Sequence, residues 1–315
     1  MKSIKRMAAN ITLMLVVFFI GMGIAELLSS FLLGKNPPIY TTGMTVAGVD
    51  LQHEMEILAI HEGRFEVIVP DNDNYRIAVI GDSVTMGGGL NLSQTYIPKL
   101  EQLIETRFHK DIRIMNFANG GTSTYQHLEI LERFVLPNTP DLVILQMNEN
   151  DYQIREDITR NTAALDRVRR LLLSKKDLSL PRWLNYKIQL YQYDVYISNM
   201  NNTVMTSNVL SPLNKFVHLL QEEDIPFILF RVPCPGDFKE YIYFDSVEKY
   251  IKDEGYPYFD LMGTTFGQLD PHAAYMSVSP DGKVLDSHPL EIGHDIIAQQ
   301  LFTLIVQGGY IKEDG

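Results

Sequence analysis

The 315-residue sequence contains a single cysteine, Cys234. One cysteine cannot form an intramolecular disulfide, so a disulfide-stabilised scaffold is excluded. The sequence also lacks Cys-x-x-Cys pairs and the paired Cys/His spacing that holds structural zinc. We therefore expect no metal site, and no motif in the sequence implies an organic cofactor.

Basic residues are also scarce. The chain has 27 Lys and Arg against 39 Asp and Glu, a net charge of −12. Residues 1–33 carry a net charge of +2, which leaves −14 for residues 34–315. Nucleic-acid binding depends on clustered Lys and Arg, so this acidic remainder argues against a nucleic-acid partner. Hydrophobic residues make up 45% of the sequence, which is enough to build a substantial folded core.

The sequence has one long apolar run, from Ile11 to Leu33, and its only charged residue is Glu26. A helix of this length spans about 34 Å, enough for a tilted crossing of a ~30 Å hydrocarbon core. We expect residues 11–33 to be a transmembrane anchor. The basic tail, residues 1–10, then lies in the cytoplasm and the main domain lies outside, as in a single-pass cell-membrane protein.

Two alternatives to the anchor stay open. The first is a cleaved signal peptide, although a clean Ala-x-Ala cleavage site is absent. The second is a buried core helix, which the apolar residues all around the segment disfavour. Residues 34–74 are expected to form a linker and N-terminal extension, which begins with the breaker Gly34-Lys35-Asn36-Pro37-Pro38.

Residues 76–90 contain an apolar strand, a small-residue turn and the start of a helix. Arg76–Ile80 is rich in β-branched side chains, and Gly81-Asp82-Ser83 ends the strand before a run of glycines. This order predicts a βα unit. Chemistry in open α/β sheets collects at the carboxyl ends of the strands, so Ser83 is a candidate nucleophile. The alternative interpretation is a tight turn in which Ser83 caps the helix.

Two similar units follow. The predicted strands 112–117 and 142–145 run into the small or amide residues of 118–124 and 147–151, with predicted helices over 94–108 and 125–135. Successive βα units indicate a parallel sheet, in which the carboxyl ends of the strands lie at the same edge. Further along, we predict a helix that starts at Ser211-Pro212 after a loop over 201–207, then a strand over 226–232. A helix over 244–254, a short strand over 258–261 and a final helix over 296–306 complete the prediction.

Residues 81–89 match the block Gly-Asp-Ser-x-Thr-x-Gly-x-Gly position by position, and so the chain resembles the SGNH, or GDSL, hydrolase family. The resemblance implies that Ser83 is the nucleophile. It also implies a flavodoxin-like, three-layer α/β/α sandwich with about five parallel strands. We expect this hydrolase-like domain to cover residues 75–310, with an insertion at about 152–210.

The family's second and third blocks resemble the next two loops. The second matches best at Gly121, with Gly120 as an alternative, and the third matches Asn150-Asp151 without its usual glycine. The resemblance implies an oxyanion hole made by the Ser83 N–H, the Gly121 N–H and the Asn150 side-chain amide. The alternative roles are a left-handed turn residue for Gly121 and an Asx-turn or cap for Asn150.

Asp286-Ser287-His288-Pro289 resembles the family's last block, which pairs an acid with the catalytic histidine. The spacing is one residue shorter than the common Asp-x-x-His, a form found in membrane-associated acetyl-transfer branches of the superfamily. The resemblance implies that His288 is the general base and that Asp286 orients it. The rival base is His294, expected to be a solvated or capping residue in a helix, and the rival acid is Asp260.

These features together predict a membrane-anchored, extracytoplasmic serine esterase. The expected substrates are O-acetyl esters of cell-envelope glycans, with lipid esters second. An O-acetyltransferase with the same triad is an alternative, and so is a non-catalytic protein that binds glycan or a partner. Aromatic residues in 178–196 predict either a wall of the substrate groove or a packed satellite cluster. The sequence leaves the oligomeric state open.

Overall fold

The computed structural model describes residues 75–110, 112–153, 200–232, 241–282 and 284–312, together with Lys187, Ile188, Tyr191 and Val195. The predicted tail, anchor and linker (1–74), Cys234 and most of the predicted insertion lie outside these residues. Among the described helices, none combines the length and hydropathy of a membrane span. All the strands and helices named below belong to one compact unit, Thr45–Ile154 with Asn201–Gly315.

The unit is built on a five-stranded sheet. The strands are β1 (Tyr75–Gly81), β2 (Ile112–Ala118), β3 (Leu142–Met147), β4 (Phe227–Arg231) and β5 (Tyr258–Asp260). Their order is β2-β1-β3-β4-β5, and each neighbouring pair is parallel. This is the flavodoxin-like order, so the predicted sheet is confirmed. Its topological switch point lies between β1 and β3, where ligands bind in such folds.

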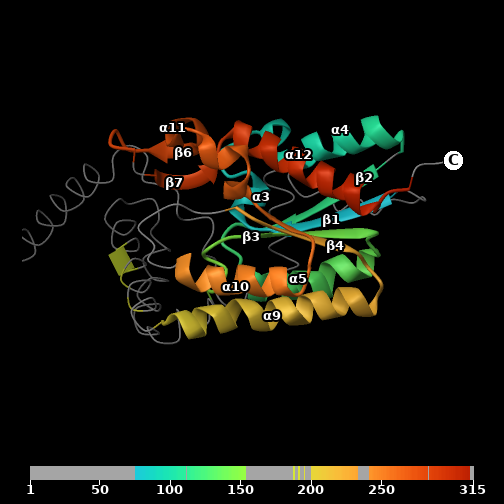
Figure 1. Ribbon diagram of the computed structural model, residues 1–315, viewed down its shortest axis with the longest axis horizontal. Helices are drawn as coiled ribbons and strands as arrows, with labels where there is room; N and C mark the ends of the chain where they lie inside the picture. Colours follow the sequence, from blue (N-terminus) through green and yellow to red (C-terminus); the bar gives the residue numbers. More distant parts are fainter. Residues whose placement is uncertain are drawn as a thin grey trace, which may run out of the picture. The chain divides into compact units, whose positions relative to one another are not determined.

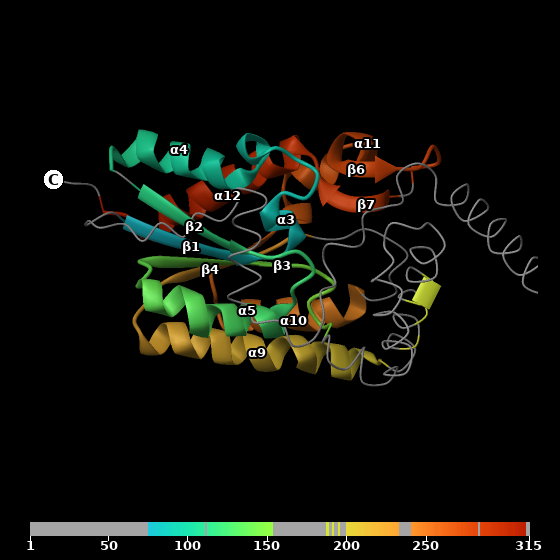
Figure 2. The same ribbon diagram turned by 180° about the vertical axis from the view of Figure 1, so that it is seen from behind.

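Helices cover both faces of the sheet (Figures 1 and 2). On one face lie α4 (Tyr96–Phe108) and α12 (Glu291–Gly308), and on the other lie α5 (Thr124–Ile130), α9 (Asn202–Glu222) and α10 (Tyr241–Asp253). A short helix, α3 (Ser83–Met86), follows β1. A separate antiparallel pair, β6 (Tyr275–Val278) and β7 (Val284–Pro289), follows the short helix α11 (Pro271–Ala274).

Single-turn segments complete the described elements. They are η1 (Leu92–Gln94), η2 (Leu131–Val135), η3 (Leu136–Asn138), η4 (Leu261–Gly263) and η5 (Thr265–Gln268). The η2 segment is a π-helical turn that directly continues α5. The predicted helix over 125–135 is therefore present, but its second half leaves α-helical geometry.

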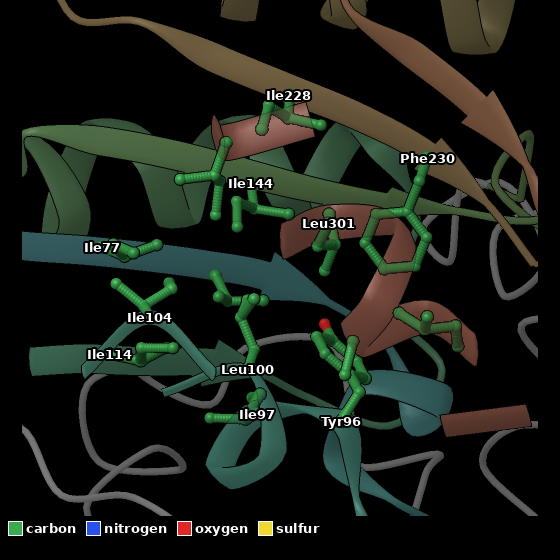
Figure 3. Packing of buried hydrophobic residues seen from close by; sticks show 14 of the residues in the cluster. Ile77, Tyr96, Ile97, Leu100, Ile104, Ile114, Ile144, Ile228, Phe230 and Leu301 are labelled. Atoms are coloured by element: carbon green, nitrogen blue, oxygen red, sulfur yellow. The ribbon is translucent and has the colours of Figure 1, made fainter. Parts of the chain in front are cut away.

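The core lies between the sheet and its helices. Ile77–Ile80 of β1 are fully buried on both faces of the strand, which explains the uninterrupted apolar run in the sequence. The buried residues of α4 recur at helical spacing, as with Leu100 and Ile104. Figure 3 shows these two side chains and Leu301 of α12 near the strand residues. Each such buried Leu or Ile contributes ~1.5–3 kcal/mol to stability.

The start of α9 differs from the prediction. The helix begins at Asn202 and contains Pro212, whereas the sequence predicted a start at Ser211-Pro212 after a loop. Asn201 caps the helix, because its Oδ1 accepts the Val204 N–H at 3.0 Å. Buried side chains continue at helical spacing on both sides of Pro212, from Met205 to Leu220. This packing offsets the hydrogen bond that proline removes, so the prediction of a helix start at proline was wrong.

Candidate active site

The turn Gly81-Asp82-Ser83 joins β1 to α3, and we call it the nucleophile turn after the candidate nucleophile Ser83. Asp82 caps α3 by accepting the Val84 N–H at 2.9 Å, and Ser83 is the first residue of the helix. Gly81 leaves no room for a side chain, since an added Cβ would lie 2.2 Å from Thr85 Oγ1. The chain therefore turns sharply at the carboxyl end of β1, and this places Ser83 at the sheet's switch point.

Ser83, His288 and Asp286 form a continuous hydrogen-bonded chain. His288 Nε2 lies 2.8 Å from Ser83 Oγ, and His288 Nδ1 lies 2.6 Å from Asp286 Oδ1. Both distances are within the reach expected for a nucleophile, its base and the group that orients the base. The structure thus brings together the three side chains that the sequence singled out, although Ser83 and His288 are 205 positions apart.

The short Asp-x-His spacing follows from secondary structure. Asp286 and His288 both lie on β7, and residues two apart on a strand project to the same face. The His288 N–H also donates to Asp286 Oδ1, at 3.1 Å, which ties the carboxylate to the imidazole twice. An extended segment therefore pairs acid and base at a spacing one residue shorter than the common family spacing.

The hydrogen bond between His288 and Asp286 shifts the pKa values of both groups in the directions that suit His288 as a general base. The hydrogen bond to Asp286 raises the pKa of His288 above its usual value, with burial acting in the opposite direction. The same hydrogen bond lowers the pKa of Asp286. An ionised carboxylate only accepts hydrogen bonds, so the proton of neutral His288 is assigned to Nδ1. The Nε2 lone pair then faces the Ser83 hydroxyl and can take its proton.

Gly88 allows the imidazole to approach the nucleophile turn. An added Cβ at Gly88 would lie 3.1 Å from His288 Cδ2, and the Gly88 N–H donates to Ser83 O at 2.9 Å. The sequence motif did not reveal this role, because Gly88 occupies an unspecified position of the Gly-x-Gly segment. The only hint in the sequence was that the run Gly87-Gly88-Gly89 has a glycine at its middle position, which the motif does not require.

The loop after β2 lies against the nucleophile turn. The Asn119 N–H donates to Gly81 O at 3.0 Å, and the Thr122 hydroxyl is 3.3 Å from the same oxygen. Gly121 has a φ of +71°, which agrees with its alternative role as a left-handed turn residue. An added Cβ at Gly120 would lie 3.8 Å from Ser83 Cβ. Both glycines thus remain candidates for the oxyanion donor.

The loop after β3 carries Asn150, which is half-buried. The Asn150 N–H donates to Asn148 Oδ1 at 2.9 Å, which is a local Asx-type bond. The loop is tied to the nucleophile turn, because Asn148 Nδ2 donates to Asp82 Oδ2. The oxyanion hole of Ser83, Gly121 and Asn150 stays a prediction, and the structure places all three on loops that are bonded to one another.

The two rival residues have other partners. His294 is 1% exposed and stacks on Tyr96, and its Nδ1 accepts the Tyr96 N–H at 3.3 Å. Burial lowers the pKa of His294 to about 4. Of the two expected roles, the solvated one was wrong, because His294 packs under the first turn of α4. Its acceptance of the first N–H of that helix agrees with the expected capping role. Asp260 accepts from Arg231 Nη1 at 3.0 Å and from the Met262 N–H.

A buried ion pair lies beside the site and was not predicted. The Arg231 guanidinium contacts Glu149 and Asp260 and lies 4.5 Å from the centre of the Phe244 ring. Tyr243 donates to the Glu149 carbonyl at 2.7 Å. Within the described ranges, no group of three or more His, Cys, Asp or Glu side chains could hold a metal ion.

No family model and no curated protein matches this sequence. Among solved structures, it is similar to a lipase/acylhydrolase from Enterococcus faecalis, with a TM-score of 0.48 and 16% identity over 76% of this chain and 99% of that one. It is also similar to the psychrotrophic esterase EstA from Pseudoalteromonas sp. (TM-score 0.46, 14% identity, 76% and 100% covered). A third is the acetylxylan esterase Axe2 from Geobacillus stearothermophilus (TM-score 0.46, 17% identity, 73% and 94% covered).

Proposed function

We propose that this chain is a serine ester hydrolase of the SGNH type. The observation that carries the proposal is the unbroken hydrogen-bonded chain from Ser83 through His288 to Asp286. A serine hydroxyl is a weak nucleophile until an adjacent base can accept its proton, and His288 Nε2 is in position to do so. A non-catalytic protein of this fold has no requirement for that geometry.

The proposed reaction has two steps. Ser83 Oγ attacks the ester carbonyl while His288 takes the hydroxyl proton, and the imidazolium is stabilised by Asp286. The tetrahedral intermediate collapses to an acyl-enzyme when His288 returns the proton to the leaving alcohol. Water then attacks the acyl-enzyme with His288 again as base, which releases the carboxylic acid and restores Ser83.

The oxyanion of each tetrahedral intermediate needs fixed neutral donors. The proposed donors are the Ser83 N–H, the Gly121 N–H and the Asn150 side-chain amide, since their loops meet at the end of β1 and β3. Losing one such donor typically costs ~10²–10³ in rate.

The proposed substrates are O-acetyl esters of cell-envelope glycans. Two features support an accessible ester outside the cytoplasm. The side chains of His288 and Asp286 remain 31% and 44% exposed, so the described part of the site is open. The apolar run 11–33 predicts a domain that faces outward from the membrane. Transfer of the acetyl group to a sugar hydroxyl in place of water uses the same triad and is the second candidate.

The test is labelling of the full chain, purified in detergent, with a fluorophosphonate probe, beside p-nitrophenyl acetate turnover. We expect both signals in the wild-type protein and neither in Ser83→Ala. Ser279→Ala, on the turn between β6 and β7, is the matched control and should keep both. Absence of labelling in the folded wild-type protein would reject the esterase and favour a glycan- or partner-binding protein.

A further inference from the structure

Two side-chain amides from the end of β3 hold Asp82. Gln146 Oε1 accepts the Asp82 N–H at 3.0 Å, and Asn148 Nδ2 donates to Asp82 Oδ2. Gln146 lies on β3 and Asn148 directly follows its last residue, Met147, so both amides reach Asp82 from the carboxyl end of this strand. All three residues are at most 1% exposed. Burial raises the pKa of the Asp82 carboxyl, whereas the Asn148 donor acts to lower it.

Asn148 uses both ends of its amide. Its Nδ2 reaches Asp82, directly before Ser83, and its Oδ1 accepts the Asn150 N–H at 2.9 Å. The orientation of the amide follows from these partners, because a carboxylate accepts and a backbone N–H donates. One buried side chain thus bonds to the nucleophile turn and to the loop of the candidate oxyanion donor. Buried networks of this kind lose much when one member is removed.

We propose that Asn148 is a positioning residue that couples the nucleophile turn to the Asn150 loop. This role rests on the proposed function, since it matters for catalysis only if Ser83 and Asn150 act on one substrate. Asn148 stands where the resemblance places a glycine, and a glycine could form neither side-chain bond. Misplacing reacting groups by about 1 Å costs ~10²-fold in rate. A bond that fixes the position of the nucleophile turn relative to the Asn150 loop should therefore have a measurable effect on kcat.

The chain offers a swap that separates coupling from general damage. Asn148→Asp keeps an acceptor for Asn150 but sets a second carboxyl against Asp82. Combining it with Asp82→Asn restores every bond, because Asn at 82 can donate to Asp at 148 and still accept the Val84 N–H. Asn148→Gly removes both bonds at once. Asn138→Asp is the matched control, since Asn138 Nδ2 donates to Phe134 O beyond the far end of β3.

We expect Asn148→Gly and Asn148→Asp to lower kcat for p-nitrophenyl acetate about 10- to 100-fold. KM should stay within about threefold, because the defect lies in transition-state positioning. The double variant Asp82→Asn/Asn148→Asp should recover kcat to within about fivefold of wild type. Asn138→Asp should match wild type throughout. Amide hydrogen exchange of peptides spanning 81–90 and 147–153 should accelerate together in Asn148→Gly.

Wild-type kcat in folded Asn148→Gly, or a double variant no better than Asn148→Asp, would overturn the coupling. Amide hydrogen exchange that accelerates in only one of the two peptides would also overturn the proposed coupling. The wild-type protein could lack turnover while amide exchange still accelerates in both peptides of Asn148→Gly. That result would support the coupling through Asn148 and reject the proposed esterase. Turnover in wild type with no response to substitution at Asn148 leaves the esterase standing and rejects the coupling.

Discussion

His288 and Asp286 face the same side of β7 and are joined by a 2.6 Å hydrogen bond between imidazole Nδ1 and carboxylate Oδ1. The bond explains the raised pKa of His288 and the lowered pKa of Asp286. A base must be unprotonated to accept the Ser83 proton, so this bond sets the pH at which the site can work.

The first prediction concerns that pH. In the wild-type protein, kcat/KM should fall as pH drops through the raised pKa of His288, because protonated imidazole cannot act as base. In Asp286→Asn the supporting hydrogen bond to a charge is lost, so the midpoint should move to lower pH. The plateau rate should fall ~10²–10⁴-fold. Asp253→Asn, exposed near the end of α10, should leave the profile unchanged. A midpoint that moves upward in Asp286→Asn would contradict this account.

The second prediction concerns Gly88. Gly88→Ala places a Cβ 3.1 Å from His288 Cδ2, so the imidazole must shift by a few tenths of an ångström. We expect kcat to fall about 3- to 30-fold with little loss of thermal stability. The matched control is Gly263→Ala, where an added Cβ meets nothing within 4 Å. Equal kcat values in the two variants would show that the close approach has no consequence.

The third prediction concerns acid stability. Burial lowers the pKa of His127 to about 3 and that of His294 to about 4. Between these values and the ordinary pKa near 6.5, the unfolded chain binds more protons than the folded one, so stability falls as pH falls. Each histidine contributes up to ~1.4 kcal/mol per pH unit in that window.

Urea denaturation of His294→Gln isolates one of these contributions. On going from pH 7 to pH 5, the variant should lose about 2 kcal/mol less free energy of unfolding than wild type. Glutamine can still accept the Tyr96 N–H that His294 Nδ1 accepts. His218→Gln, on the exposed face of α9, is the control and should behave as wild type. Equal losses in His294→Gln and wild type would refute the assignment of a neutral buried His294.

The fourth prediction concerns the buried Arg231 pair. The side chains of Arg231 and Glu149 are 9% and 2% exposed, so Arg231→Leu leaves Glu149 buried without its cation. We expect a loss of about 3–5 kcal/mol in the free energy of unfolding. The exposed pair of Lys215 and Glu132 provides the comparison, and Lys215→Leu should cost at most about 1 kcal/mol. Similar losses in both variants, measured by urea denaturation, would show that Arg231 is not effectively desolvated.

The first three strands were largely predictable from sequence, because each is a short, mostly apolar run followed by small or amide residues. β1 and β2 lie within a residue or two of their predicted ranges. For β1 the reason is that a strand buried on both faces leaves a continuous apolar signal. The start of α9 was not predictable from the same rules. Proline is usually read as a helix start, and the apolar stripe that carries α9 past Pro212 depends on tertiary packing.

The residues of the site also fall into a group that the sequence could predict and a group that it could not. Ser83, Asp286 and His288 belong to local motifs, so the sequence could single them out. The Asp82–Asn148 bond joins residues 66 positions apart, and no local pattern reports such a contact. The burial of His294 likewise depends on α4, whose first residue is 198 positions away along the chain. The sequence analysis therefore missed the contacts between segments that are far apart along the chain.

The wide separation of Ser83 and His288 along the chain has a consequence for biogenesis. The nucleophile turn is synthesised early, but its base arrives only with β7, close to the C-terminal helix α12. A nascent chain, or one cut anywhere before β7, therefore carries a serine with no partner to take its proton. In the proposed esterase, the reactivity of Ser83 would therefore depend on completion of the polypeptide as far as β7.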